Sequence, residues 1–101
     1  MTTFFSNTTA AGTSTAYPVN INGGELMAFN VEGLGDATIQ LQRLAPSGNY
    51  IPVLYNGAAD IDTDGHYIVD GLSGTYRVVQ AGTSDGLYAS LETENAARVA
   101  L

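Results

Sequence analysis

The chain has 101 residues, of which 13% are charged, and its ten acidic residues against three arginines give a formal net charge of −7 at pH 7. Nucleic acids are bound mainly by clustered lysine and arginine, so three scattered arginines exclude a nucleic-acid partner and disfavour an anionic membrane surface. No apolar run approaches the roughly 20 residues of a membrane-spanning helix, and the lack of cysteine excludes disulfides and thiolate metal sites. This length fits one domain with a modest core.

Residues 1–16 are interpreted as a flexible arm ahead of the domain. Residues 6–16 are small and polar without periodicity, and they cannot bury enough apolar surface to offset the entropy of ordering them. Phe4 and Phe5 either pack under the domain's own edge or anchor the arm on a neighbouring subunit, because large rigid apolar side chains dominate interface energetics. Together with Tyr17, they are the expected partner-binding residues.

Residues 17–93 contain short strand patterns separated by turn signals, and residues 94–101 form a tail or a short last strand. Asn22-Gly23-Gly24 and Asp64-Gly65 each predict a hairpin turn, Asn56-Gly57 predicts a further turn, and Pro52 confines its strand to an edge or bulge. The strand patterns lie at residues 17–22, 25–31, 37–44, 50–55, 60–63, 66–69, 75–80 and 87–93. Residues alternate along them, and one face of each of three strands is apolar: Met27, Phe29 and Val31; Ile39 and Leu41; and Leu87, Ala89 and Leu91. Tyr76 and Val78 alternate with Thr75, Arg77 and Val79 in the same way. The chain is therefore predicted to be all-β, an antiparallel β-sandwich (jelly-roll or Ig-like) of seven or eight short strands.

The segment Asp60–Gly65 opens like an EF-hand loop, with carboxylates at positions 1, 3 and 5 and glycine at position 6. The match ends there, because position 12 is Gly71 in place of glutamate. A looser β-loop calcium site of Asp60, Asp62 and Asp64 is one alternative. The interpretation we favour makes Asp60 and Asp62 solvent-facing strand residues, with Asp64 in a turn, so we expect no metal or other cofactor.

His66 is the only histidine, and it lacks the partners that a zinc site or a catalytic triad needs. No serine lies in a G-x-S-x-G elbow, although paired carboxylates meeting in the fold remain an alternative. The six tyrosines fit half-buried strand positions or, alternatively, a stacking platform for sugars. We expect no enzyme activity.

Three segments, Gly33–Leu44, Gly71–Val79 and Leu87–Leu91, occur in an order that resembles the small β-sandwich structural proteins of tailed bacteriophages, of the capsid decoration or cement type. The resemblance implies a virion protein that is made in the host cytoplasm and binds the major capsid protein on the outside of the shell. It also implies a homo-oligomer, with a trimer favoured.

A second resemblance covers residues 37–79 only. Asp64-Gly65, Tyr67 and Leu72–Tyr76 are similar to the corresponding turns of carboxypeptidase-regulatory and adhesin-repeat sandwiches, although the chain has no lysine for an isopeptide cross-link. Two alternative functions follow from these features: a carbohydrate-binding β-sandwich module, and a phage tail or connector structural protein.

Overall fold

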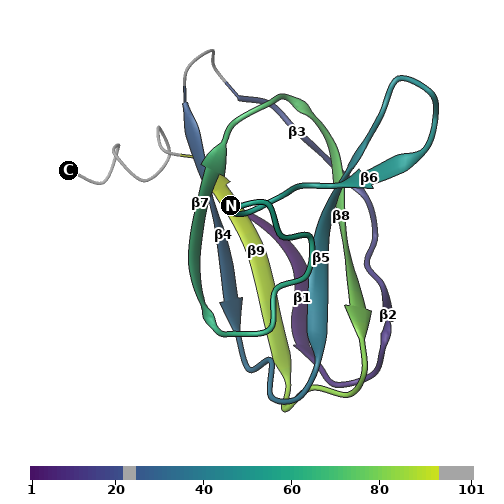
Figure 1. Cartoon of the computed structure of the whole chain (residues 1–101), viewed down its shortest axis with the longest axis vertical. Helices are drawn as coiled ribbons and strands as arrows, with labels where there is room; N and C mark the ends of the chain where they lie inside the picture. The colour runs from purple at the N-terminus through teal and green to yellow at the C-terminus, as the bar shows by residue number, and fades with distance from the viewer. Residues whose placement is uncertain (22–24, 94–101) are drawn as a thin grey trace.

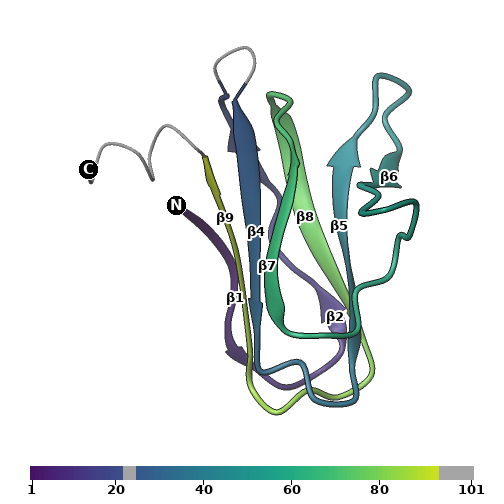
Figure 2. The ribbon, with the colours of Figure 1, turned by 60° about the vertical axis from the view of Figure 1, so that its left-hand side comes forward.

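The computed structural model describes residues 1–21 and 25–93, and this part of the chain forms strands and no helix. Two antiparallel sheets face each other, as Figures 1 and 2 show. Sheet A has the order β1 (Thr2–Thr8), β9 (Leu87–Thr93), β4 (Leu26–Glu32) and β7 (Gly65–Asp70). Sheet B has the order β2 (Gly12–Thr13), β8 (Gly74–Ala81), β5 (Thr38–Leu44) and β6 (Tyr50–Pro52), with β3 (Tyr17–Val19) also paired to β8. The predicted all-β antiparallel sandwich is confirmed.

One apolar core lies between the two sheets. Alternate residues of each central strand point inward, as the period of two in a strand requires. The inward side chains are at most 4% exposed and comprise Met27, Phe29 and Val31 on β4, Leu87, Ala89 and Leu91 on β9, Ile39 and Leu41 on β5, and Tyr76 and Val78 on β8. The alternation predicted for these strands is therefore confirmed.

Tyr76 fixes the place where the chain crosses from β7 in sheet A to β8 in sheet B. Its ring is 1% exposed, and its hydroxyl donates a 2.6 Å hydrogen bond to the carbonyl oxygen of Leu72, four residues upstream. In the same connection, the Ser73 hydroxyl accepts from the Ile21 N–H at 2.8 Å and donates to the Ile21 carbonyl at 3.0 Å. A buried tyrosine that bonds back to the preceding connection is a known corner device of β-sandwiches.

The interpretation of residues 1–16 as a flexible arm is wrong, because these residues belong to both sheets and the sandwich begins at Thr2. Strand β1 pairs with β9, and β2 pairs with β8. The register of β1 shifts between Thr3 and Phe5, which makes Phe4 an additional residue in a bulge. The bulge turns both adjacent phenylalanines toward the core, where each is 8% exposed.

The small polar residues at and after the end of β1 have little apolar surface to bury. Hydrogen bonds from buried side chains hold their backbone in place. The buried side chain of Gln80 donates to the carbonyl oxygens of Thr9 and Gly82, both at 3.0 Å. The buried Ser84 hydroxyl donates to the Thr8 carbonyl at 2.7 Å. Composition alone does not reveal this anchoring, because the groups held are backbone carbonyls that every residue has.

Both predicted hairpins are wrong, whereas the predicted edge strand is confirmed. Strands β3 and β4 lie in different sheets, so their connection is not a hairpin, and its residues 22–24 lie outside the described part of the chain. Gly65 is the first residue of β7, whose partner is β4, while Ile61 forms an isolated bridge with Ile39. Strand β6, which contains Pro52, lies at the edge of sheet B.

The predicted tail, residues 94–101, also lies outside the described residues.

The burial of Phe5 gives a first prediction. Phe5→Ala should lower the free energy of unfolding by roughly 3–5 kcal/mol, because it removes a buried aromatic ring and leaves a cavity. Urea denaturation followed by circular dichroism measures this change. Thr3→Ala is the control, since Thr3 is exposed on the same strand and its change should stay within about 0.5 kcal/mol. An unchanged midpoint for Phe5→Ala would show that β1 does not contribute to the core.

Candidate functional site

All three candidate calcium ligands are exposed residues, and the first two have separate hydrogen-bond partners. The Asp60 carboxylate accepts a 2.7 Å hydrogen bond from the Gln40 side-chain amide. The Asp62 carboxylate accepts a 3.1 Å hydrogen bond from the hydroxyl of the neighbouring Thr63. The two carboxylates are therefore held by different hydrogen-bond donors.

The third carboxylate, Asp64, holds the connection between β4 and β5. Its two oxygens accept hydrogen bonds from the backbone N–H groups of Gly33 and Leu34, both at 3.0 Å. Gly33 has a positive φ of 82°, and a Cβ there would lie 2.3 Å from the Gly86 carbonyl oxygen, so only glycine fits. Charge-assisted bonds of this kind are stronger than neutral ones. Asp64 therefore has a structural role at the start of β7.

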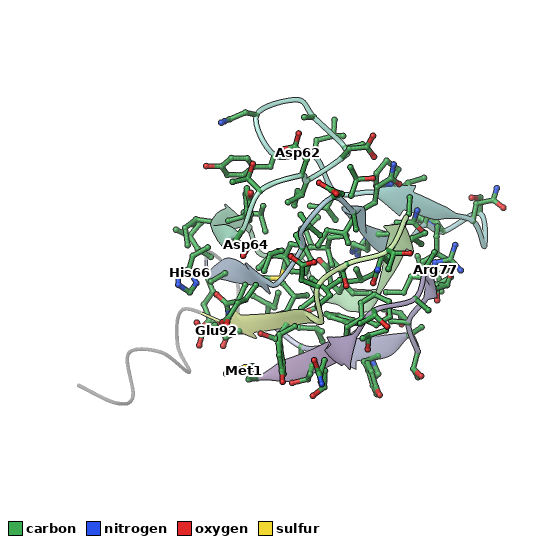
Figure 3. All side chains as sticks on the ribbon, turned by 90° about the horizontal axis from the view of Figure 1, so that it is seen from below. Met1, Asp62, Asp64, His66, Arg77 and Glu92 are labelled. Atoms are coloured by element: carbon green, nitrogen blue, oxygen red, sulfur yellow. The ribbon has the colours of Figure 1, made fainter. Side chains whose placement is uncertain are left out.

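His66 lies on the outer face of sheet A in a polar hydrogen-bonded group. Its Nδ1 atom is 2.6 Å from the Asn30 side-chain oxygen, and the Asn30 amide donates to Ser90 and Glu92, both at 3.3 Å. Figure 3 shows His66 and Glu92 on one side of the molecule and Arg77 on the other. Among residues 1–21 and 25–93, no three histidine, aspartate or glutamate side chains come together as a metal site.

The three residues predicted to bind a partner are close together but differ in exposure. Phe4 and Phe5 lie in the chain's own core, so their side chains do not form a surface for another subunit. The Tyr17 ring is 38% exposed and lies 6.0 Å from the Phe4 ring, centroid to centroid. Of the three, Tyr17 presents the most surface to a partner.

A group of exposed aliphatic side chains around one groove was not recognised from the sequence. A groove of about 370 Å³ lies beside strand β7, and we call it the β7 groove. The described residues that line it include no charged side chain. Four of its aliphatic residues are well exposed: Leu26 at 39%, Leu54 at 55%, Ile68 at 52% and Leu72 at 59%. The other lining residues are Val53, Tyr55, Asn56 and Val69.

Strand register and turn geometry explain why these aliphatic side chains reach the surface. Ile68 is opposite Ala28 on the outer face of sheet A, since its neighbours Tyr67 and Val69 pack against the core. Leu54 precedes the predicted Asn56-Gly57 turn, which is confirmed by reciprocal hydrogen bonds between residues 55 and 58. A signal was present in the sequence: large aliphatic residues stand beside turns, as Leu72 does between Gly71 and Gly74.

Tyr55, which lines the groove, packs against a second tyrosine, Tyr67. The rings of Tyr55 and Tyr67 meet edge to face, with centroids 5.0 Å apart and an angle of 87° between the planes. The Tyr67 hydroxyl donates a hydrogen bond to the Thr63 carbonyl. Burial raises the pKa of Tyr67, and the nearby Asp62 carboxylate raises it further.

The tyrosines do not form one stacking platform. Tyr50 lies under the Arg77 guanidinium, which is 3.9 Å from its ring centroid and also donates to Gln42 at 2.9 Å. Tyr76 is in the core, and the exposed Tyr88 is on β9, a strand of the opposite sheet. A sugar-binding platform needs neighbouring rings on one face, and the one close pair, Tyr55 with Tyr67, meets edge to face.

The role of Asp64 gives a second prediction. Asp64→Ala should lower the free energy of unfolding by about 1–3 kcal/mol, because two backbone N–H groups lose their acceptor. Urea denaturation of the variant and the parent measures this change. Asp62→Ala, at the neighbouring exposed carboxylate, is the control and should change stability by less than about 0.5 kcal/mol. A calcium-dependent rise in the parent's melting temperature that Asp64→Ala abolishes would instead indicate a metal ligand.

The raised pKa of Tyr67 gives a third prediction. The unfolded chain releases the tyrosine proton near pH 10, whereas the folded chain retains it to higher pH, so this stabilisation is present below about pH 10 and lost above it. Between pH 9 and 11, the free energy of unfolding should therefore fall less for Tyr67→Phe than for the parent. Urea denaturation at each pH measures this difference. Tyr88→Phe, at an exposed tyrosine, should follow the parent. Parallel curves for Tyr67→Phe and the parent would contradict the role of Tyr67.

Comparison of the chain with protein-family models, with curated proteins and with solved structures finds no match in any of the three. Within the part of the chain that the structure describes, there is no helix of the length and apolar character that crossing a membrane requires. The surface of the chain is therefore the basis for a functional proposal, and the β7 groove is the feature that we use.

Proposed function

We propose that the chain is a non-catalytic structural protein of a tailed-phage virion, a decoration protein that binds the major capsid protein on the outside of the shell as a homo-oligomer. The observation that carries the proposal is the β7 groove. Exposed apolar side chains that gather at one place on the surface mark interaction sites, whereas singly scattered ones do not. A chain with four exposed aliphatic side chains around one uncharged groove has the surface of an assembly component.

The distribution of charge supports the same proposal. The net charge is −7, which keeps an unassembled protein soluble through mutual repulsion. The described lining of the groove carries no charge, and the cores of protein interfaces are likewise depleted in charged residues. The combination suits a protein that is made soluble and then becomes part of a permanent particle.

The chemistry of the described polar groups supports a non-catalytic role. His66 is hydrogen-bonded to an amide rather than to a carboxylate, so it lacks the orienting acid of a triad. Asp64 is engaged by backbone N–H groups. The separate positions of the tyrosines give no specific support to carbohydrate binding, and a tail or connector position remains the alternative within the same particle.

Co-sedimentation tests the proposal and gives a fourth prediction. The purified protein should pellet with capsids of the phage that encodes it, and not with separately purified tails, up to a saturating number of copies per capsid. It should also raise the temperature at which the capsids release their DNA. Pelleting with tails alone would move the protein to the tail, and pelleting with neither would overturn the proposal.

A matched pair of variants locates the contact with the capsid. Tyr17→Ser should weaken capsid binding about tenfold, because exposed interface tyrosines contribute strongly to binding energy. Tyr88→Ser removes a comparably exposed tyrosine from β9 and should leave binding unchanged. Both variants should be checked for parental thermal stability, since Tyr17 also contacts Phe4.

A further inference from the structure

The sheet edges of the described chain differ in how they are protected against pairing with another strand. Proline, bulges and short length are the usual protective devices. Strand β1 has two register shifts, and β6 has three residues including Pro52. At the other edge of sheet B, β2 has two residues and β3 has three, including Pro18.

Strand β7 has none of these devices. Its six residues pair with β4 in unbroken register from Gly65 to Asp70, and they include no proline and no lysine. The strand ends sheet A, so its outer edge has no described strand beside it. His66, Tyr67, Ile68 and Val69 include the β-branched and aromatic residues that favour strand pairing. This is the edge that another strand can extend.

The β7 groove lies along the same edge, so a strand that pairs with β7 also covers apolar surface. Ile68 and Leu26 are exposed at the outer face, and Leu54 and Leu72 at the other side of the groove. A standard interface buries about 800 Å² per partner, which is about one seventh of the 5671 Å² exposed by the chain. Backbone pairing would supply direction and register, and the exposed aliphatic side chains would add apolar contacts.

We propose that β7 pairs antiparallel with β7 of a second copy of this chain, around a twofold axis at Ile68, and joins the two four-stranded sheets into one sheet of eight strands. Side chains alternate between the two faces of a strand. The core-facing side chains of the two copies therefore lie on the same face of the joined sheet only if the numbers of two opposed residues are both odd or both even. The register centred on Ile68 places it opposite its own copy. Tyr67 is then opposite Val69, an aromatic and β-branched pair of the stabilising kind.

The chemistry of the surface favours a second copy over other occupants. A basic peptide would find no charged partner among the described residues that line the groove. A copy of the same edge is also uncharged at the groove, and the acidic residues elsewhere are screened beyond about 8 Å at physiological ionic strength. A self-complementary patch gives a closed twofold pair, in place of the trimer that the phage resemblance implies.

Light scattering after size exclusion tests the pair and gives a fifth prediction. The parent should have the mass of a dimer, and Ile68→Lys should weaken dimerisation at least a hundredfold, because two ammonium groups would meet at the axis. Ile51→Lys is the matched control, since Ile51 is comparably exposed, at 51%, on another edge strand. Raising the NaCl concentration from 0.02 to 0.5 M should strengthen the parent dimer by screening its net charge.

Cross-linking tests the register without depending on the lysine variant. Opposed residues of an antiparallel pair have Cα atoms about 4.5–5.5 Å apart, within the range that a disulfide spans. The chain has no cysteine, so Ile68→Cys treated with diamide should form a covalent dimer, whereas Ile51→Cys should stay monomeric on a denaturing gel. A monomeric parent, an oligomer that Ile68→Lys leaves intact, or absence of the Ile68→Cys dimer overturns the proposal. None of these readouts uses capsids, so failure of the twofold pair is distinguishable from failure of capsid binding.

Discussion

The rest of the sandwich depends on the buried hydrogen bond from the Tyr76 hydroxyl to the Leu72 carbonyl. This bond fixes the residue at which the chain leaves sheet A and enters sheet B. Strand β8 then pairs with β2, β3 and β5, so its register determines sheet B. A slip by one residue would turn Val78 from the core to solvent and Arg77 into the core, where an unpaired charge is costly.

The N-terminal segment adds one strand to each of the two sheets. Its bulge places two phenylalanines in the core, while Gln80 and Ser84 hold the backbone that follows. The segment therefore adds β1 to one sheet and β2 to the other. With three of the sheet edges irregular, short or interrupted by proline, strand β7 remains as the regular edge.

A candidate ligand carboxylate has a structural role in this fold, and several aliphatic side chains lie at the surface instead of in the core. Asp64, a candidate metal ligand by spacing, binds two backbone N–H groups and supports a glycine-dependent connection. Leu54 and Leu72, which composition would assign to the core, are exposed at the β7 groove. The proposed virion role and the proposed twofold pair both depend on this surface rather than on polar chemistry, and each is tested by a separate experiment.

The sequence by itself determined the all-β class, the inward faces of β4, β5 and β9, and the edge position of Pro52. These features depend on the period of two and on the missing N–H of proline, which are local properties. Only the tertiary structure decided which strands pair across the two sheets, that the polar N-terminal segment is ordered, and that Leu54, Ile68 and Leu72 meet in one groove. Such contacts join residues far apart in the chain, and no periodicity within a short segment specifies them.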